Sequence, residues 1–416
     1  MAVMATSDVP ARRRSSRALE LDGILQQVAI EQIATMGWDA VSARSITASA
    51  GVTIGAFYAR FISKAELARQ LWEQVLADHL LGALGRVIEA AHDPDGLIEA
   101  IAPFTAGSPE LVAAFELVLA SQWEEPLRRG VGEPAAEVLA AWFDPEAHGP
   151  VGAAVRVAAV GLAIGLLIRS GRPWTDAIDL GSELERHAAV FADPGDPVDL
   201  DPTIDEGSPL RVRQFNGTDG STARLLMAMV ETVATMGYRR ATLSHTCASI
   251  GVTTGFLFAR YDTKLDLMVA AVEATWSQST VQSQSLALDL AGRFDLGIVE
   301  AALWREFLHP DLGDLRRFLM EVERLARMEP TLMAAIAERE TEAARQVAGA
   351  TSPWDAPPSV EVGMALGIGL PAVALLVPSI WTLPFSALTV GLMASEPEVE
   401  GGLWGERAGR RGPGVG

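Results

Sequence analysis

The residues best able to hold a metal or act as nucleophiles are few and scattered in this 416-residue chain. The close spacing that zinc sites use is absent among the six histidines, His79, His92, His148, His187, His245 and His309. The single cysteine, Cys247, excludes an intrachain disulfide framework and a thiolate cluster and suits a reducing cytoplasm. We therefore expect no metal site and a cytoplasmic protein.

A second candidate for chemistry is the string Gly367-Ile368-Gly369-Leu370-Pro371-Ala372, which matches a dinucleotide-binding pattern. Such glycines hold a pyrophosphate only where they join a strand to a helix. Here the string lies inside residues 362–395, a run without any charged residue and with three prolines. An enzyme with a bound cofactor is therefore not predicted.

Charge is unevenly distributed along the chain. The net charge is −20, yet residues 1–69 carry +2 and residues 207–268 carry +3, so the remainder carries −25. Contact with phosphate depends on local charge. Two mildly basic segments on acidic bodies could approach DNA while the bodies are repelled by it.

These two basic segments are copies of one another. Residues 25–67 align with 225–267 without a gap, and 16 of the 43 positions are identical. Weaker similarity continues downstream, where Glu125-Pro126 matches Glu329-Pro330 at an offset of 204 and Trp174-Thr175 matches Trp381-Thr382 at an offset of 207. A duplication of about 200 residues explains the pattern.

Each copy begins with the pattern of three short helices. Apolar positions 25, 28, 29, 33 and 36, repeated 200 residues later, have helical spacing, and Gly37 and Gly237 are suited to end that helix. Second helices are expected at 43–50 and 243–250, and a Gly-Val-Thr turn leads into a third helix that ends near Arg60 in the first copy. This is a helix-turn-helix pattern, whose last helix enters the major groove of DNA.

The segment SARSITASAGVTIGAFYARFISKAEL, residues 42–67, resembles the DNA-binding signature of the TetR family of bacterial regulators. The matching features include Ala50-Gly51-Val52-Thr53, Phe57-Tyr58 and Ser63-Lys64, and the pattern recurs at 242–267. The resemblance implies an all-α protomer with a three-helix head and a larger helical body that binds a small ligand and dimerises. It also implies double-stranded DNA as a partner.

The resemblance also implies roles for individual residues. Thr53, Tyr58 and Lys64 would contact phosphates, while Ile54 and Ala56, with Arg44, would reach base edges and favour thymine methyl groups. The complete set expected in the first head is Arg44, Thr53, Ile54, Ala56, Phe57, Tyr58, Arg60 and Lys64. The run Arg12-Arg13-Arg14 is either a groove-binding arm or a solvated chain start.

The second copy departs from the first at the expected interface. Phe258 replaces Tyr58 and removes a hydroxyl, and Phe256 replaces Ala56. The retained or equivalent contacts would be Thr253, Thr254, Phe258, Arg260 and Lys264. We therefore expect the second head to bind a different half-site or to bind more weakly.

The bodies contain clustered aromatic residues and long apolar segments. An effector cavity is one interpretation of the aromatic side chains and ordinary core is the other; the residues are Phe104, Phe115, Trp123, Trp142, Trp174, Trp304 and Phe318. The uncharged run 362–395 is long enough for a membrane span. Because it aligns with a shorter run at 151–168, a buried pairing interface is favoured and no membrane partner is expected.

The predicted organisation is a basic arm (1–18), head 1 (19–68), body 1 (69–192), a linker (193–220), head 2 (221–268), body 2 (269–395) and a disordered tail (396–416). The predicted function is a transcriptional regulator, a repressor released by a small apolar effector, that acts as a fused pseudo-dimer on an imperfect palindrome. Pairing between two whole chains is the competing arrangement. The alternative function is a ligand-binding or interaction protein whose second head no longer binds DNA.

Overall fold

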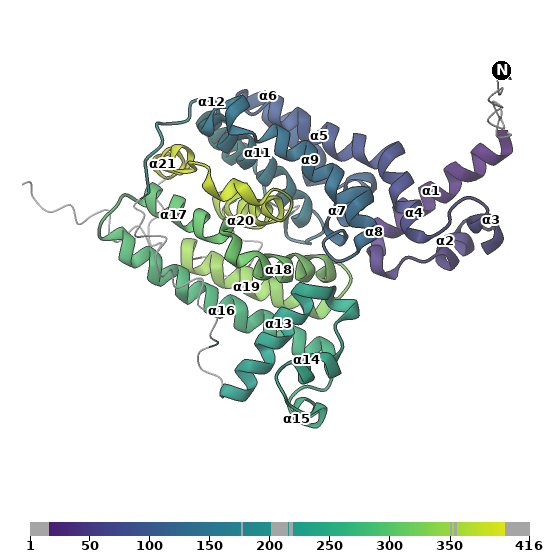
Figure 1. The fold of residues 1–416 in the computed structure, drawn as a ribbon. Coiled ribbons are helices and arrows are strands. Elements are labelled where there is room, and N and C mark those ends of the chain that lie inside the picture. Colours follow the sequence, from purple (N-terminus) through teal and green to yellow (C-terminus); the bar gives the residue numbers. More distant parts are fainter. Residues whose placement is uncertain are drawn as a thin grey trace, which may run out of the picture.

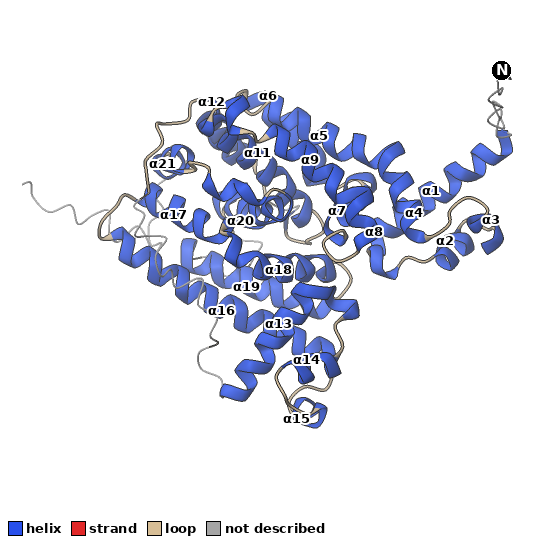
Figure 2. Cartoon of the chain, viewed as in Figure 1, coloured by secondary structure: helices blue, strands red, loops and turns tan. Residues whose placement is uncertain are grey.

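The computed structural model describes residues 16–175, 178–200, 215, 219–349, 352 and 356–395. Every regular element in these ranges is a helix, as Figure 2 shows, so the predicted all-α fold is confirmed. Residues 1–15, most of the expected linker and the whole of the expected tail lie outside the described ranges.

The first half of the chain forms a head followed by a layered helical body (Figure 1). The head contains α1 (Ser16–Met36), the 3-10 turn η1 (Trp38–Ala40), α2 (Ala43–Ser49) and α3 (Ile54–Tyr58). The body contains α4 (Lys64–Leu71), η2 (Trp72–Leu76), α5 (Ala77–Glu89), α6 (Pro94–Ala106), α7 (Pro109–Ala120), α8 (Glu125–Leu127), η3 (Arg128–Gly132), α9 (Glu133–Trp142), α10 (Pro145–His148), α11 (Pro150–Arg169) and α12 (Gly181–Ala192).

The helices of the second half follow one another in an order similar to that of the first half. Its head contains α13 (Gly220–Arg240), α14 (Leu243–Ser249) and α15 (Thr254–Phe258). Its body contains α16 (Lys264–Ala291), α17 (Leu296–Leu308), η7 (Pro310–Leu312), α18 (Gly313–Ala326), α19 (Pro330–Ala348), α20 (Pro358–Leu376), η9 (Pro378–Thr382) and α21 (Ser386–Ala394). The long α16 stands where the first half has α4, η2 and α5 in succession.

The caps of the head helices follow from single side chains. Ser42 and Thr242 begin the second helices, and their hydroxyls accept hydrogen bonds from the backbone N–H three residues on. Thr263 forms a full capping box with Asp266 at the start of α16. At the start of α4 only half of such a box is present, because Ser63 accepts from the Glu66 N–H while the Glu66 carboxylate binds Arg69 and Gln70.

Backbone direction changes at the glycines that the sequence singled out. Gly37 and Gly237 have φ of 72° and 76°, and Gly51 has a φ of 66° in the turn between α2 and α3. A side chain is strongly disfavoured at these angles. The chain therefore turns at positions that require glycine: at Gly37 and Gly237 near the end of the first helix of each head, and at Gly51 before the third helix of the first head.

The two bodies meet along α11 and α20, which cross at backbone contact. A Cβ atom added to Gly369 would lie 1.8 Å from the carbonyl oxygen of Gly161, and one added to Gly165 would lie 1.8 Å from that of Ala365. Helices α12 and α21 flank this crossing, and a single apolar core contains residues of both halves. The glycines of the dinucleotide-like string thus lie within a helix, where they allow close packing instead of a strand-to-helix turn.

Helices α11 and α20 are also the two that could cross a membrane by length and composition alone. In the structure 83% of the apolar stretch of α11 and 61% of that of α20 are buried. Core helices of ordinary domains have the same length and composition, so this observation gives little support for a membrane span.

Candidate nucleic-acid interface

The third helix of the first head presents polar and apolar side chains to solvent. Tyr58 is 58% exposed and Ile54 is 45% exposed. Thr53 is exposed and precedes α3, and its hydroxyl makes no capping bond within the helix. Arg44 on α2 is exposed, and Ala56 is half-buried. The accessible part of α2 and α3 therefore offers two hydroxyls, a guanidinium and apolar groups, which suits a sugar-phosphate edge and thymine methyl groups.

Phe57 does not belong to this surface. Its ring is fully buried and packs against Phe61, with the ring centroids 5.1 Å apart, and edge-on against Tyr58. The prediction that Phe57 contacts DNA is wrong, because consecutive residues of a helix point in different directions and the neighbour of an exposed Tyr58 faces the core. Leu257 is buried at the same place in the second head.

The arginines after the third helices are bound within their own heads. Arg60 forms an ion pair with Asp22 on α1 and donates a 2.9 Å hydrogen bond to the Ala56 carbonyl. Arg260 donates to the Thr222 hydroxyl at 3.1 Å and stacks over the Phe256 ring. Both arginines thus connect the third helix to the first. A phosphate contact from either residue stays a prediction, and the guanidinium would have to bind the phosphate while it keeps these internal contacts.

The lysines that open α4 and α16 also support the heads from inside. The ammonium of Lys64 donates to the carbonyls of Trp38 at 2.5 Å and Val41 at 2.9 Å, and lies 3.8 Å from the centre of the Trp38 ring. Lys264 donates in the same way to the Tyr238 carbonyl. Burial lowers the pKa of Lys64 to about 8. The expected phosphate contact would have to use the third N–H of this ammonium.

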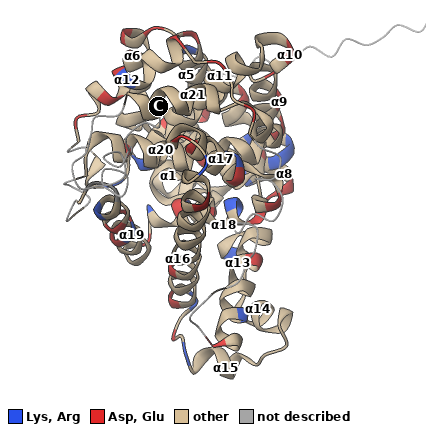
Figure 3. Ribbon diagram, turned by 90° about the vertical axis from the view of Figure 1, so that its left-hand side faces the viewer, with Lys and Arg blue, Asp and Glu red and all other residues tan. Residues whose placement is uncertain are grey.

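The second head exposes a different set of groups. Thr253, Thr254 and Phe258 are exposed, and Phe258 is 54% exposed where the first head has a tyrosine. The hydroxyl of Thr253 accepts a hydrogen bond from the Phe256 N–H at 3.2 Å. Neither α14 nor α15 contains an Asp or Glu, as Figure 3 shows, so no carboxylate on these helices would repel a phosphate.

Sequence reasoning missed the two glutamates that hold the heads on the bodies. Glu116 on α7 accepts the backbone N–H of Trp38 at 2.8 Å, and Glu321 on α18 accepts that of Tyr238 at 2.6 Å. Each N–H follows a glycine with positive φ, Gly37 directly after α1 and Gly237 at a kink within α13. For Glu116, the available signal was a single carboxylate in the otherwise apolar segment Leu111–Ala120.

The aromatic residues proposed as an effector pocket do not line one cavity. Phe104 and Phe115 are buried in the core shared by both bodies, whereas Trp174 and Phe318 belong to the core of the second head. The others are set apart from these: Trp123 bonds the Ala234 carbonyl, Trp142 is partly buried on the first core and Trp304 packs on Phe385. Two cavities in the described part measure about 10 and 20 Å³, far below the ~300 Å³ or more of a typical ligand pocket.

Comparison with known proteins identifies the first head. Residues 25–71 match the family model described as bacterial regulatory proteins, tetR family. The first head is therefore similar to the DNA-binding domain of this family. The match supports a DNA-binding regulator of transcription with a helix-turn-helix head, on a chain whose described part is helical throughout. No curated protein matched the chain.

Proposed function

We propose that this chain is a cytoplasmic transcriptional repressor that binds an imperfect palindrome with two heads of one polypeptide and has no catalytic activity. The observation that carries the proposal is the TetR-like first head, in which Arg44, Thr53, Ile54 and Tyr58 are all exposed to solvent. A second head of similar helical order, without a carboxylate on α14 or α15, supplies the other DNA contact. The exposed Phe258 in place of Tyr58 is the reason to expect unequal half-sites.

Pairing of the two bodies within one chain is supported by the crossing of α11 and α20. Gly161 and Gly369 approach so closely that their backbones touch, and the buried core continues from one body into the other. A TetR-type reader needs two heads about one DNA turn, ~34 Å, apart. A chain whose own halves pack together fulfils that requirement without a second polypeptide.

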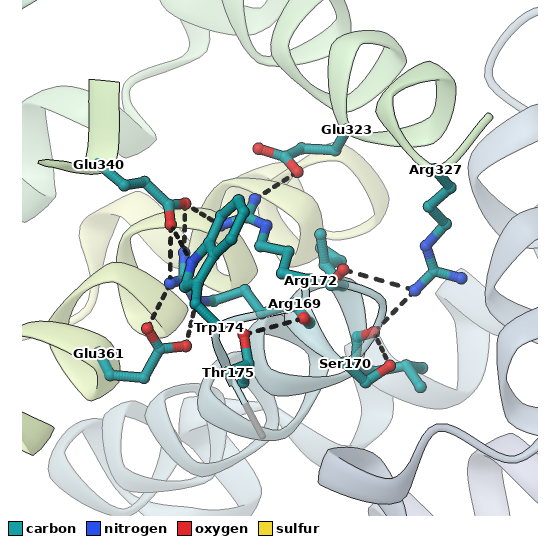
Figure 4. Close-up of polar contacts among 11 residues, drawn as sticks. Arg169, Ser170, Arg172, Trp174, Thr175, Glu323, Arg327, Glu340 and Glu361 are labelled. Carbon is teal, nitrogen blue, oxygen red and sulfur yellow. Dashed lines mark hydrogen bonds and ion pairs between the residues drawn. The ribbon is translucent and has the colours of Figure 1, made fainter. Parts of the chain in front are cut away.

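A buried charge cluster at the end of α11 also favours pairing of unlike halves (Figure 4). Arg169 is completely buried and binds Glu340 at 2.6 Å and Glu361, while Arg172 binds Glu340 and, at 2.5 Å, Glu323. The indole of Trp174 donates to Glu340 at 2.9 Å. Both arginines come from the first half of the chain, and all three carboxylates come from the second half.

The corresponding positions in the other half carry no such charges. At the offset of 207 that aligns Trp174 with Trp381, Arg169 matches Leu376 and Arg172 matches Ser379. Two first halves packed together would bury arginines without carboxylates, and an uncompensated buried charge is strongly destabilising. The cluster is therefore complementary only when one first half meets one second half.

For the small apolar effector of the proposal, we infer entry into a more open form of the body. A cavity of about 20 Å³ between Phe115, Leu119, Ile168 and Arg327 has room for little more than a water molecule. A ligand that binds only a more open body would shift the protein toward that form by its difference in affinity for the two states. We propose that such opening separates the heads and releases DNA.

The test combines mass in solution with a DNA footprint. The full chain is offered DNA from upstream of its own gene and a random duplex library, at two salt concentrations. We expect one 44.2 kDa chain on one footprint with unequal protection of its halves, and weaker binding at the higher salt. The double variant Thr53→Ala/Tyr58→Phe should bind less tightly, whereas Thr382→Ala, an exposed threonine on the body, should bind normally.

The alternative function, a ligand-binding or interaction protein, is favoured by one observation, the net charge of −20. It predicts no salt-sensitive complex with any duplex. Two chains on a doubled footprint would instead keep the regulator and overturn the fused pseudo-dimer.

A further inference from the structure

The two heads are attached to the bodies at equivalent turns, Gly37-Trp38 in the first half and Gly237-Tyr238 in the second, which we call elbows. At each elbow a glycine with positive φ, Gly37 or Gly237, turns the backbone so that the next N–H points into the body. Glu116 accepts the N–H of Trp38, and Glu321 accepts that of Tyr238. The carboxylate positions thus determine where each first helix ends relative to the body.

One arginine holds both of these carboxylates. Arg324 binds Glu116 with two donors, Nη2 to Oε1 at 2.7 Å and Nε to Oε2 at 3.0 Å. Its remaining terminal nitrogen, Nη1, donates to Oε2 of Glu321 at 2.5 Å. The Arg324 side chain is only 6% exposed, and those of Glu116 and Glu321 are 10% and 1% exposed. The planar guanidinium fixes the relative position of both groups it binds.

Further contacts connect the elbows directly. Arg239 of the second head donates to the Asp39 carbonyl of the first, and the Trp123 indole of the first body lies beside Gly237 and donates to the Ala234 carbonyl at 3.0 Å. Arg324 itself reaches Asp39 at 3.5 Å and lies over the Trp123 ring. The elbows are therefore in contact with each other as well as with the bodies.

We infer that Arg324 is a positioning residue that sets the separation and angle of the two heads, and so the half-site spacing that the protein accepts. The inference rests on the proposed function, because it concerns DNA that spans both heads. Arg324 is buried on α18 and acts through Glu116 and Glu321, with a longer contact to Asp39, and not by touching DNA itself. No second arginine performs this role from the first half, since the residues at offsets of 204 and 205 are Ala120 and Leu119.

Removal of this arginine changes the elbows in a defined way. Arg324→Met leaves two buried carboxylates near each other without the cation that binds both, and they must take up protons, admit water or move apart. Each response shifts a hydrogen-bond acceptor on which one head depends. The heads then sample a range of separations, while the surface of each head that faces DNA is unchanged.

The experiment uses the full-length chain and the duplex that the wild-type protein selects from a random library. Binding is measured for that duplex, for each isolated half-site, and for duplexes with one to three base pairs added to or removed from the spacer. Three variants are compared with wild type: Arg324→Met, Arg324→Lys and, as a matched control, Arg327→Met. Arg327 is a half-buried arginine three residues after Arg324, at the end of α18, and its hydrogen bonds go to the carbonyls of Leu167 and Ile168.

We expect Arg324→Met to lose roughly tenfold or more in affinity for the full duplex, because linked sites lose avidity when their geometry is wrong. Half-site affinity should stay within about twofold of wild type, and the spacer preference should become broader. The affinity of Arg324→Lys for the full duplex should lie between those of wild type and Arg324→Met, since one ammonium cannot reproduce the two-donor contact with Glu116. If Arg324→Met does not fold, the spacer preference of Arg324→Lys decides the question.

Two results would overturn the inference: a ratio of full-site to half-site affinity equal to that of Arg327→Met, or an unchanged spacer preference in both Arg324 variants. A wild-type protein that selects no duplex would instead contradict the proposed function, and so the two failures are distinguishable.

Discussion

Replacement of Gly369 by alanine offers a sharp test of the packing between the two bodies. The added methyl would lie 1.8 Å from the Gly161 carbonyl oxygen and 2.7 Å from the Gly165 nitrogen. Both are backbone atoms of α11, so no side-chain rotation can relieve the overlap. Since favourable contacts between such atoms begin near ~3.5 Å, α20 would have to retreat by more than about 1 Å along this crossing.

The expected cost follows from two opposing terms. Overpacking of a tight core costs about 1–3 kcal/mol and sometimes more, and here the whole α11–α20 contact is disturbed. Alanine is about 1 kcal/mol better than glycine inside a helix, which offsets part of this. We therefore expect Gly369→Ala to lower the free energy of unfolding by roughly 2 kcal/mol or more.

Gly367 provides the matched control, two residues earlier on the same helix. A methyl at this position meets nothing within 4 Å. Gly367→Ala should therefore raise the free energy of unfolding by about 0.5–1 kcal/mol through helix propensity alone. Urea unfolding of both variants, followed by circular dichroism and tryptophan fluorescence, measures the difference. Equal unfolding curves for the two alanine variants would refute the close α11–α20 crossing.

Three further predictions concern the charge cluster, a buried histidine and the heads. Arg169→Met should lower the free energy of unfolding, measured with urea, by about 3–5 kcal/mol because it leaves Glu361 buried without its cation. The double variant Arg169→Met/Glu361→Met should recover most of that loss, and a double variant as unstable as the single one would contradict this reasoning. Burial lowers the pKa of His187 from 6.5 to about 4, so the folded state disfavours the charged ring. The contribution of the neutral His187 ring to the free energy of unfolding is therefore present above pH 6.5 and lost as the pH falls toward 4. In His187→Gln the free energy of unfolding should fall less over that interval, and an identical pH profile would show that another group titrates. In gel shifts Tyr58→Phe should weaken binding several-fold while Phe258→Tyr strengthens it, by the value of about one hydrogen bond; no change in either would remove these positions from the interface.

Local rules were sufficient to predict the framework of the heads. The caps at Ser42, Thr242 and Thr263 and the left-handed glycines Gly37 and Gly237 depend on residues within one helical turn of each other. Their hydrogen bonds and backbone angles are set by neighbours along the chain, so the sequence order alone contains the required information. The predicted helices 43–50 and 243–250 differ from those observed by one residue.

Long-range partners could not be predicted in this way. Lys64 looked like a phosphate ligand because its position suits one, but it also meets the Trp38 carbonyl, 26 residues away, which only the folded head brings near. The role of Arg324 depends on Glu116, 208 residues earlier in the chain. Helical periodicity indicates which face of a helix is buried, but it does not say which charge from another helix will be opposite. Phe57 shows a smaller error of the same kind, since a motif match does not separate exposed from buried members.

The single arginine between the elbows, Arg324, has a consequence for how the DNA specificity of this protein can evolve. In a regulator assembled from two identical chains, a residue near the symmetry axis is present twice, and two buried arginines there would repel each other. A duplicated chain can place one cation between two carboxylates because each half varies independently. Head spacing therefore becomes a property that one codon can alter, and a new operator geometry can be reached without a matching change in the other half.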